Sequence, residues 1–140
     1  MKTDVPLAEV MTPHPRSVQI DQKLSDVRTA LADYRIHHLP VVDGKRLVGI
    51  ISVTDLLEFG FRPRESHEDQ DEYLDAHFSI EQIMQPNVVT IPSHSNVQDA
   101  ARTLSTGALH AAPVVDDDHN LVGIVTSTDL VSYLVSQFQD

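Results

Sequence analysis

The sequence contains the same unit twice, and this duplication constrains the fold more than any other feature. A shift of 73 or 74 residues aligns the two copies: Met11 with Met84, Pro13 with Pro86, His37 with His110, PVVD at 40–43 with PVVD at 113–116, and LVGIISVTDL at 47–56 with LVGIVTSTDL at 121–130. With a single one-residue gap between 11–56 and 84–130, the alignment predicts two copies of one supersecondary unit.

Each copy predicts the element order β-α-β-β-α, so we expect an α/β (α+β) fold of tandem repeats. A helix is expected in each copy from apolar residues at helical spacing: Leu24, Val27, Leu31 and Tyr34, then Val97, Ala100, Ala101, Leu104 and Ala108. Ser95 with Gln98 predicts a capping box for the later helix, and Gly107 is expected near its C-terminal end. Extended segments are expected at 17–20, 39–43, 46–52, 88–91, 112–116 and 120–126, and a further helix from Asp55 and from Asp129.

The repeats divide the chain into repeat 1 at 7–60, a linker at 61–79 and repeat 2 at 80–136, which we expect to form one compact module. The linker is acidic, because Glu65 to Asp75 contain six acids and no Lys or Arg. Such a run predicts a solvated linker or an exposed helix. The alternative is a recognition strip for a basic partner or a divalent cation, although the spacing of a calcium-binding loop is absent.

The bulk composition excludes several classes of function. A chain of 140 residues without Cys can bury its own core, and it has no disulfide or thiolate chemistry. A formal net charge of −11 disfavours nucleic acid and anionic membranes as partners. No apolar run approaches the roughly 20 residues of a membrane span. Because no secretory signal is visible, we expect a cytoplasmic protein.

The sequence lacks the motifs of common enzymes and metal sites. It has no G-x-S-x-G, P-loop or G-x-G-x-x-G motif, so hydrolases, NTPases and dinucleotide-binding enzymes have no matching residues. Its eight His residues include no H-x-x-x-H or HExxH pairing. We therefore expect no enzyme activity, no metal site and no required cofactor.

A hydroxyl–carboxylate motif closes both copies, Ser52-Val-Thr-Asp55 in the first and Thr126-Ser-Thr-Asp129 in the second. It fits a capping box, in which the hydroxyl accepts from an early helix N–H. Other features suit a ligand site: a glycine inside each preceding strand (Gly49 or Gly123), a second hydroxyl in each motif, and a helix N-terminus whose N–H groups favour an anion. Because the carboxylate suits a ribose diol, the groups together predict a nucleotide site.

The motifs M-x-P, PVVD and GIISVTDL or GIVTSTDL resemble those of a CBS domain pair, or Bateman module, over residues 7–136. The resemblance implies a stand-alone regulatory module that binds AMP, ADP, ATP or related ligands in clefts between two repeats related by pseudo-two-fold symmetry. It also implies a regulated partner protein and a homodimer. The apolar segments 56–61 and 130–138 are expected to form core helices whose outer parts meet the second copy.

The resemblance implies two clefts when its motifs are carried over to this sequence. The first would contain Ile124, Thr126, Thr128 and Asp129, completed by Pro15, Arg16, Ile36 and His37. The second would contain Ile50, Ser52, Thr54 and Asp55, completed by Val88, Val89, Leu109 and His110. In each cleft the Asp would bind ribose, the hydroxyls would face phosphate and the Ile would contact adenine.

The two clefts are not expected to bind equally. Arg16 can pair with a phosphate, whereas Val89 at the matching position cannot, so we expect the Asp129 cleft to be the occupied one. The acidic chain favours AMP over ATP as the ligand. Two alternatives are a scaffold with empty clefts and a sensor of S-adenosylmethionine or a divalent cation.

Overall fold

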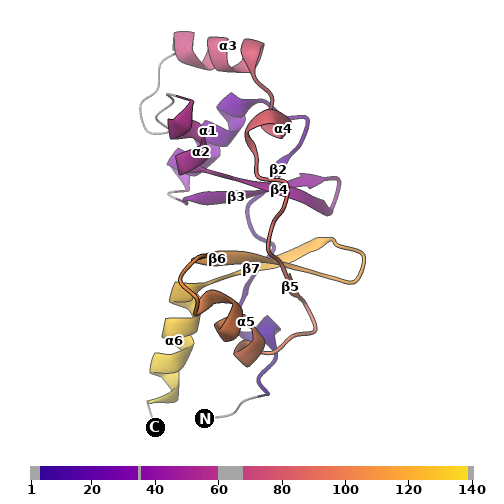
Figure 1. Cartoon of the computed structure of the whole chain (residues 1–140), viewed down its shortest axis with the longest axis vertical. Helices are drawn as coiled ribbons and strands as arrows, with labels where there is room; N and C mark the ends of the chain where they lie inside the picture. The colour runs from indigo at the N-terminus through magenta and orange to yellow at the C-terminus, as the bar shows by residue number, and fades with distance from the viewer. Residues whose placement is uncertain (1–3, 35, 60–67, 139–140) are drawn as a thin grey trace. The chain divides into compact units, whose positions relative to one another are not determined.

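The computed structural model describes residues 4–34, 36–59 and 68–138, and its elements follow the two sequence copies (Figure 1). The first copy forms β2 (Val18–Gln19), α1 (Leu24–Asp33), β3 (His38–Asp43), β4 (Arg46–Ser52) and α2 (Val53–Glu58). The second forms β5 (Ile91–Pro92), α5 (Val97–Leu104), β6 (Ala111–Val115), β7 (Leu121–Thr126) and α6 (Ser127–Gln137). The predicted order β-α-β-β-α is confirmed in both copies, with first strands shorter than expected.

The chain folds as two compact units, and each unit includes the segment that precedes the other unit's repeat in the sequence. Unit A comprises Arg16–Val88, and unit B comprises Val89–Asp140 together with Met1–Pro15. The segment ahead of the first repeat's β2 therefore lies with the second repeat. The segment ahead of β5, which includes α4 (Ile80–Ile83), lies with the first repeat.

Unit A is built on a three-stranded sheet with the order β2-β3-β4. β2 is parallel to β3, and β3 is antiparallel to β4. The apolar side chains of α1 recur every three or four residues, so they share one face. Leu24, Val27 and Leu31 on this face are buried in one core with Leu39 and Ile51 of the sheet.

Unit B has a four-stranded sheet with the order β1-β7-β6-β5. Its β1 (Thr12–Pro13) was not predicted from the sequence, and it pairs antiparallel with β7 after a short 3-10 helix, η1 (Leu7–Glu9). Ala100 and Leu104 of α5 are buried in a core with Leu7. The N-terminal segment thus contributes a strand and a core side chain to the second repeat.

The helices after the hydroxyl–carboxylate motifs begin two residues earlier than predicted. α2 begins at Val53 and α6 at Ser127, not at Asp55 and Asp129. The first hydroxyl residue of each motif takes the N-cap position, so the Asp occupies the third helical position. An acidic side chain there still lies in the first turn, where the helix dipole favours negative charge.

The ends of α5 and α1 correct three further details. The capping box of α5 is Asn96 with Asp99, not Ser95 with Gln98. Asn is as effective an N-cap as Ser, and its side-chain oxygen accepts from the Asp99 N–H at 2.9 Å. Gly107 follows the helix end with φ +77°, as its predicted position suggests. Ala108 and Tyr34, which were expected on helix faces, lie beyond the helix ends and are exposed.

The described part of the acidic segment forms the helix α3 (Glu68–His77). Of the two predicted forms, the helix is therefore the correct one; it is exposed on one side, with Tyr73 54% exposed, and packs on α1 with the other. Arg28 Nε and Nη2 each donate to Asp71 at 2.8 Å. The Asp75 carboxylate accepts from the N–H and hydroxyl of Ser25 at 2.9 and 2.6 Å. Leu74 is 1% exposed. The acidic side chains that make these contacts therefore hold two helices of unit A together.

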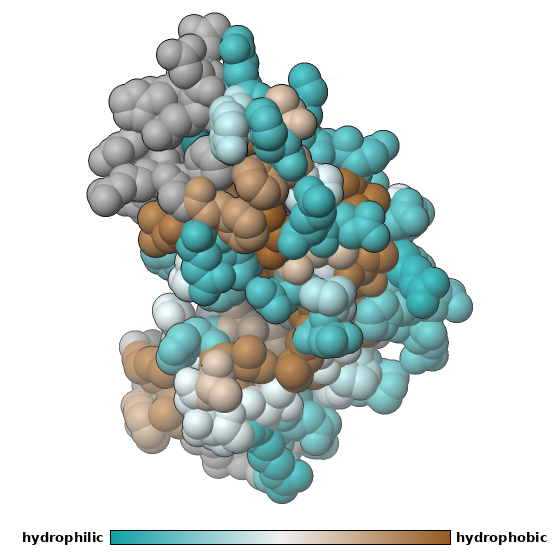
Figure 2. Space-filling model, turned by 45° about the horizontal axis from the view of Figure 1, so that its top comes forward, coloured by the Kyte–Doolittle hydropathy of each residue, from teal (hydrophilic) through white to brown (hydrophobic). Residues whose placement is uncertain are grey.

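The expectation of core helices holds only in part for α6 and for α2, and in α6 it is Leu130 that packs against the core of unit B. No side chain of α6 is fully buried, and Val131, Val135 and Phe138 are 58%, 49% and 73% exposed. In α2, Leu56 is fully buried whereas Leu57 is 49% exposed. α6 therefore exposes several apolar side chains, and brown, hydrophobic atoms do reach the surface in Figure 2.

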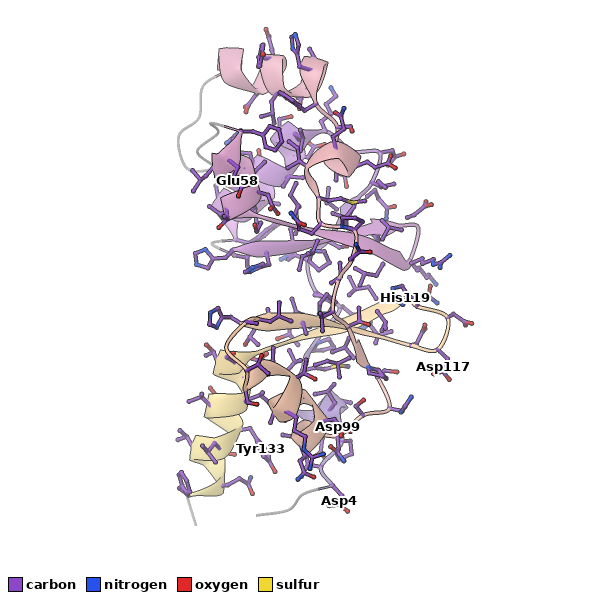
Figure 3. All side chains as sticks on the ribbon, in the orientation of Figure 1. Asp4, Glu58, Asp99, Asp117, His119 and Tyr133 are labelled. Carbon is purple, nitrogen blue, oxygen red and sulfur yellow. The ribbon has the colours of Figure 1, made fainter. Side chains whose placement is uncertain are left out.

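The two hairpin turns differ, as their lengths suggest. Gly44 has φ +67° in the first turn, a conformation that glycine adopts without strain. In the longer second turn His119 has φ +65° (Figure 3). Asp116 Oδ1 accepts from the N–H groups of Asn120 and Asp118 at 2.8 and 3.0 Å. The Asn120 N–H above all lowers the pKa of Asp116 from its ordinary value.

Candidate functional site

The candidate site of each unit lies where the second hairpin strand continues into a helix. Ser52 Oγ accepts from the Asp55 N–H at 3.1 Å, and Asp55 Oδ2 accepts from the Ser52 N–H at 2.8 Å. Thr126 and Asp129 make the same two bonds at 3.0 and 2.9 Å. The predicted capping boxes are thus confirmed. Each box leaves Oδ1 of the carboxylate and the proton of the hydroxyl for another partner.

The remaining carboxylate oxygen has different surroundings in the two units. In unit A, Asp55 is 8% exposed, and its Oδ1 accepts from the side-chain amide of Gln85 at 3.2 Å. In unit B, Asp129 is half-buried, and no described residue of that unit donates to its Oδ1. Within the described part of its unit, Asp129 Oδ1 therefore has no donor, whereas Asp55 Oδ1 already accepts one hydrogen bond.

The strand glycines make room for the methionines of the two M-x-P segments. A Cβ on Gly123 would lie 2.5 Å from Met11 Sδ and 3.1 Å from the Thr12 carbonyl oxygen. A Cβ on Gly49 would lie 2.5 Å from Met84 Sδ. The sequence predicted that a ligand or another part of the backbone comes close to both glycines. In the structure the groups that come close are the methionine side chain and the next residue's carbonyl oxygen from the M-x-P segment of the same unit. Each M-x-P segment is thereby held beside the hydroxyl–carboxylate motif of its unit.

The structure divides the predicted site residues between the two units. Unit A contains Arg16, Ile36, His37, Ile50, Ser52, Thr54, Asp55 and Val88, and unit B contains Pro15, Val89, Leu109, His110, Ile124, Thr126, Thr128 and Asp129. Within unit A the His37 carbonyl accepts from the Val53 N–H at 3.0 Å, and within unit B the His110 carbonyl accepts from the Ser127 N–H at 2.8 Å. The combination of residues from both units in one cleft stays a prediction.

Arg16, the proposed phosphate ligand, is anchored within unit A. Its guanidinium carbon lies 4.0 Å from the ring centroid of Tyr34, which makes a cation–π contact. Arg16 is otherwise exposed. This contact restrains the side chain, and the guanidinium N–H groups can still donate to an anion.

Sequence reasoning missed the middle residue of each M-x-P segment as a site residue. Gln85 pairs with Ile50, and Thr12 pairs with Ile124, at the same register of the two sheets. Each therefore lies beside the strand residue that was assigned to adenine. The alignment of MTP with MQP shows that the two residues are equivalent. Only the pairing with β4 and β7 shows that they lie next to the motif strands.

The described residues offer neither a cluster of metal ligands nor a membrane-spanning helix. They contain no group of three or more His, Cys, Asp or Glu that could hold a metal ion. No helix among them is long and apolar enough to cross a bilayer.

Comparison with known proteins identifies the family. The model of the CBS domain family matches this chain twice, over residues 7–61 and 80–136. The chain belongs to the CBS domain family. A CBS domain-containing protein of Dictyostelium discoideum is 36% identical over 123 residues, covering 85% of this chain and 83% of that protein. The uncharacterised protein MJ1232 of Methanocaldococcus jannaschii is 27% identical over 98% of this chain, which spans 40% of that protein's length.

Solved structures of CBS proteins share the fold. CBSX2 of Arabidopsis thaliana in complex with AMP superposes with a TM-score of 0.79 at 26% identity, covering 96% of this chain and 99% of that one. The CBS domain pair of protein MJ0100, in complex with 5′-methylthioadenosine and S-adenosylmethionine, gives 0.70 at 29% identity, covering 94% and 99%. The predicted fold is confirmed, and both of these CBS proteins bind adenosine compounds.

Proposed function

We propose that this CBS protein is a non-catalytic regulatory module that senses an adenosine nucleotide, with AMP as the favoured ligand. The open Oδ1 of Asp129 is the observation that carries the proposal. A carboxylate accepts hydrogen bonds from both hydroxyls of a ribose. The AMP complex of CBSX2 supports this class of ligand, since the two chains match over nearly their whole lengths.

The neighbours of Asp129 suit the rest of a nucleotide. Thr126 retains a hydroxyl proton that can be donated to a phosphate oxygen, and the exposed Thr128 offers a second one. The first turn of α6 adds N–H groups that favour an anion. Half-buried Ile124 provides an apolar surface for adenine. In the proposal, Arg16 of the other repeat pairs with the phosphate.

Asp129→Asn is expected to weaken AMP binding about 10- to 100-fold, because a hydrogen bond to a charged group contributes about 1.5–3 kcal/mol. The amide retains an oxygen for the Thr126 N–H, so the helix cap is largely preserved. Isothermal titration calorimetry measures the affinity. Asp99→Asn is the matched control, because Asp99 occupies the same capping position on α5 (Figure 3). Equal AMP affinity in Asp129→Asn and the parent chain would contradict the proposed role.

The choice of ligands in this titration tests each part of the site. Weaker binding of 2′-deoxy-AMP than of AMP is the result expected if a carboxylate recognises the diol. Arg16→Ala is expected to weaken AMP binding more than adenosine binding. S-adenosylmethionine and 5′-methylthioadenosine test the ligands of the MJ0100 pair. If none of these compounds binds, the scaffold alternative is favoured.

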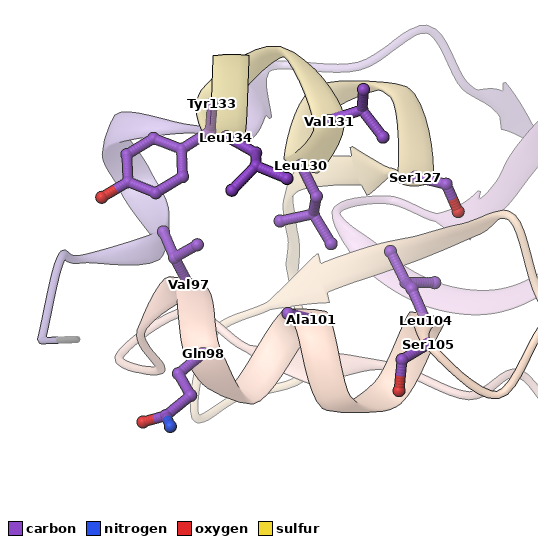
Figure 4. A pocket seen from close by; sticks show the side chains of 10 residues that line it. All are labelled: Val97, Gln98, Ala101, Leu104, Ser105, Ser127, Leu130, Val131, Tyr133 and Leu134. Carbon is purple, nitrogen blue, oxygen red and sulfur yellow. The ribbon is translucent and has the colours of Figure 1, made fainter. Parts of the chain in front are cut away.

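We also propose that the chain forms a homodimer through α6. A groove of about 410 Å³ lies between α5 and α6 within unit B, where Val97 and Ala101 face Leu130 and Leu134 (Figure 4). The Tyr133 hydroxyl is buried at this groove without a hydrogen-bond partner among the described residues. Exposed apolar residues, among them Val135 and Phe138, lie on the same helix. In a two-fold symmetric dimer, these residues of each copy can therefore pack into the groove of the other copy.

Val135→Glu is expected to shift the chain from dimer to monomer, because a charge would be buried in an apolar interface. Val89→Glu is the matched control, since Val89 and Val135 are each 49% exposed in unit B. Sedimentation equilibrium measures the mass of both variants. A dimer that persists in Val135→Glu, or is lost equally in Val89→Glu, would exclude α6 as the interface.

A further inference from the structure

Gln85 makes a contact that its counterpart in the other repeat does not make. Its side-chain Nε2 donates to Asp55 Oδ1 at 3.2 Å, and its backbone N–H and carbonyl both bond to Ile50, at 2.8 and 3.0 Å. The backbone bonds fix where the side chain begins. The amide therefore lies over the one oxygen of Asp55 that the capping box leaves available.

Thr12 occupies the equivalent position in unit B. It pairs with Ile124 in the register that Gln85 has with Ile50. A threonine side chain is two heavy atoms shorter than that of glutamine, and no hydrogen bond joins Thr12 to Asp129 within the described part of unit B. The residue between Met and Pro thus decides whether the motif carboxylate is engaged or open.

We infer that the Gln85 side chain is a built-in competitor of the ligand's ribose for Asp55, so that the module has one open and one self-occupied nucleotide site. This inference rests on the proposed function, since it concerns the same type of site. A ribose diol needs acceptor oxygen on the carboxylate. At Asp55 one oxygen accepts from the Ser52 N–H and the other from Gln85, whereas at Asp129 the second oxygen is free within its unit.

The competitor is displaceable. Gln85 as a residue is exposed, and its side chain is neutral, so the amide can turn into water without leaving a buried charge behind. A ligand at Asp55 must first break this bond, and the loss of one hydrogen bond to a carboxylate corresponds to about tenfold or more in affinity. The Asp55 site is therefore expected to fill only at higher ligand concentration than the Asp129 site.

Exchanging the two middle residues tests the competition directly. Calorimetric titration of the full chain with AMP is expected to show one strong site in the parent. Gln85→Thr, which copies the MTP of the other repeat, is expected to strengthen the weaker site about tenfold. Thr12→Gln is expected to weaken the strong site by a similar factor. Urea unfolding of both variants confirms that their stability is close to that of the parent.

The outcomes separate this inference from the proposed function. If the parent and Gln85→Thr both fail to bind AMP, the proposed function and the competition are overturned together. If the parent binds AMP at one strong site and Gln85→Thr leaves the weaker site unchanged, only the competition is overturned. Two sites of equal affinity in the parent would also overturn it.

The contact itself has a readout that needs no ligand. In ¹⁵N-edited NMR spectra, Asp55→Asn is expected to shift the side-chain amide signals of Gln85, because the charged acceptor is lost. The side-chain amide of Gln98 in unit B is the internal reference. Unchanged Gln85 signals in Asp55→Asn would show that the amide does not contact the carboxylate and would overturn the inference.

Discussion

Leu74→Ala is expected to lower the free energy of unfolding by about 2–5 kcal/mol, the range for truncating a buried leucine. Leu74 is 1% exposed and lies in the core of unit A with Leu24, Leu31 and Leu56. Its removal would leave a cavity under α3 that the neighbouring helix could fill only in part. Urea unfolding followed by far-ultraviolet circular dichroism measures the change.

Leu57→Ala is the matched control for this experiment. It makes the same change in the same unit, at a side chain that is 49% exposed, so a loss of no more than about 0.5 kcal/mol is expected. Equal losses in the two variants would contradict the packing of α3 on α1. A loss confined to Leu74→Ala would show that the acidic segment is part of the folded unit.

The contacts of α3 explain why so acidic a helix folds onto the protein. The N-cap of α1 is Lys23, which lacks a side-chain acceptor, and Asp75 of α3 accepts the Ser25 N–H at that helix start. The bidentate pair of Arg28 with Asp71 adds a second fixed point. Two of the six acids between Glu65 and Asp75 thus accept hydrogen bonds from residues of α1, and Leu74 provides the apolar contact.

The sequence predicted the features that depend on local patterns. β4 has the predicted bounds and β3 begins one residue earlier, because alternation and a turn signal define a hairpin within a few residues. The capping boxes at Ser52 and Thr126 were predicted because hydroxyl and carboxylate are three residues apart. The element order and the family followed from the repetition of these patterns.

Features that depend on distant partners could not be predicted in this way. Leu74 is one apolar residue among acids, and only the position of α1 shows that it is buried. The contact of Gln85 with Asp55 joins residues 30 positions apart. Val135 follows the apolar pattern of a core helix, yet it is 49% exposed, and no described residue of unit B buries it. In each case the local pattern is compatible with several surroundings.

Gly123→Ala is expected to lower the free energy of unfolding by about 1–3 kcal/mol, as overpacking does in a well-packed interior. The new Cβ would lie 2.5 Å from Met11 Sδ, so the thioether must move. The Thr12 carbonyl oxygen, 3.1 Å away, belongs to the backbone of β1 and can move less. Urea unfolding of the variant measures the loss.

The companion change Met11→Ala distinguishes a clash from a loss of backbone freedom. Met11→Ala alone removes a half-buried side chain and is itself destabilising. Combined with Gly123→Ala, it is expected to cost at least about 0.5 kcal/mol less than the sum of the single changes, because the sulfur is no longer in the way. If the two changes in unfolding free energy are strictly additive, Gly123 is not needed to make room for the Met11 side chain.

Gly44→Ala is the control for the backbone contribution. Gly44 has φ +67°, and a Cβ added there would have no neighbouring atom within 4 Å, so its substitution costs about 1–2 kcal/mol through backbone strain alone. No methionine truncation should relieve that cost. If Met11→Ala relieves the cost of Gly123→Ala but not that of Gly44→Ala, the contact between Gly123 and Met11 helps to hold the N-terminal segment on β7. Since Thr12 follows Met11, the same contact also positions the residue that pairs with Ile124, two residues ahead of the motif that begins at Thr126.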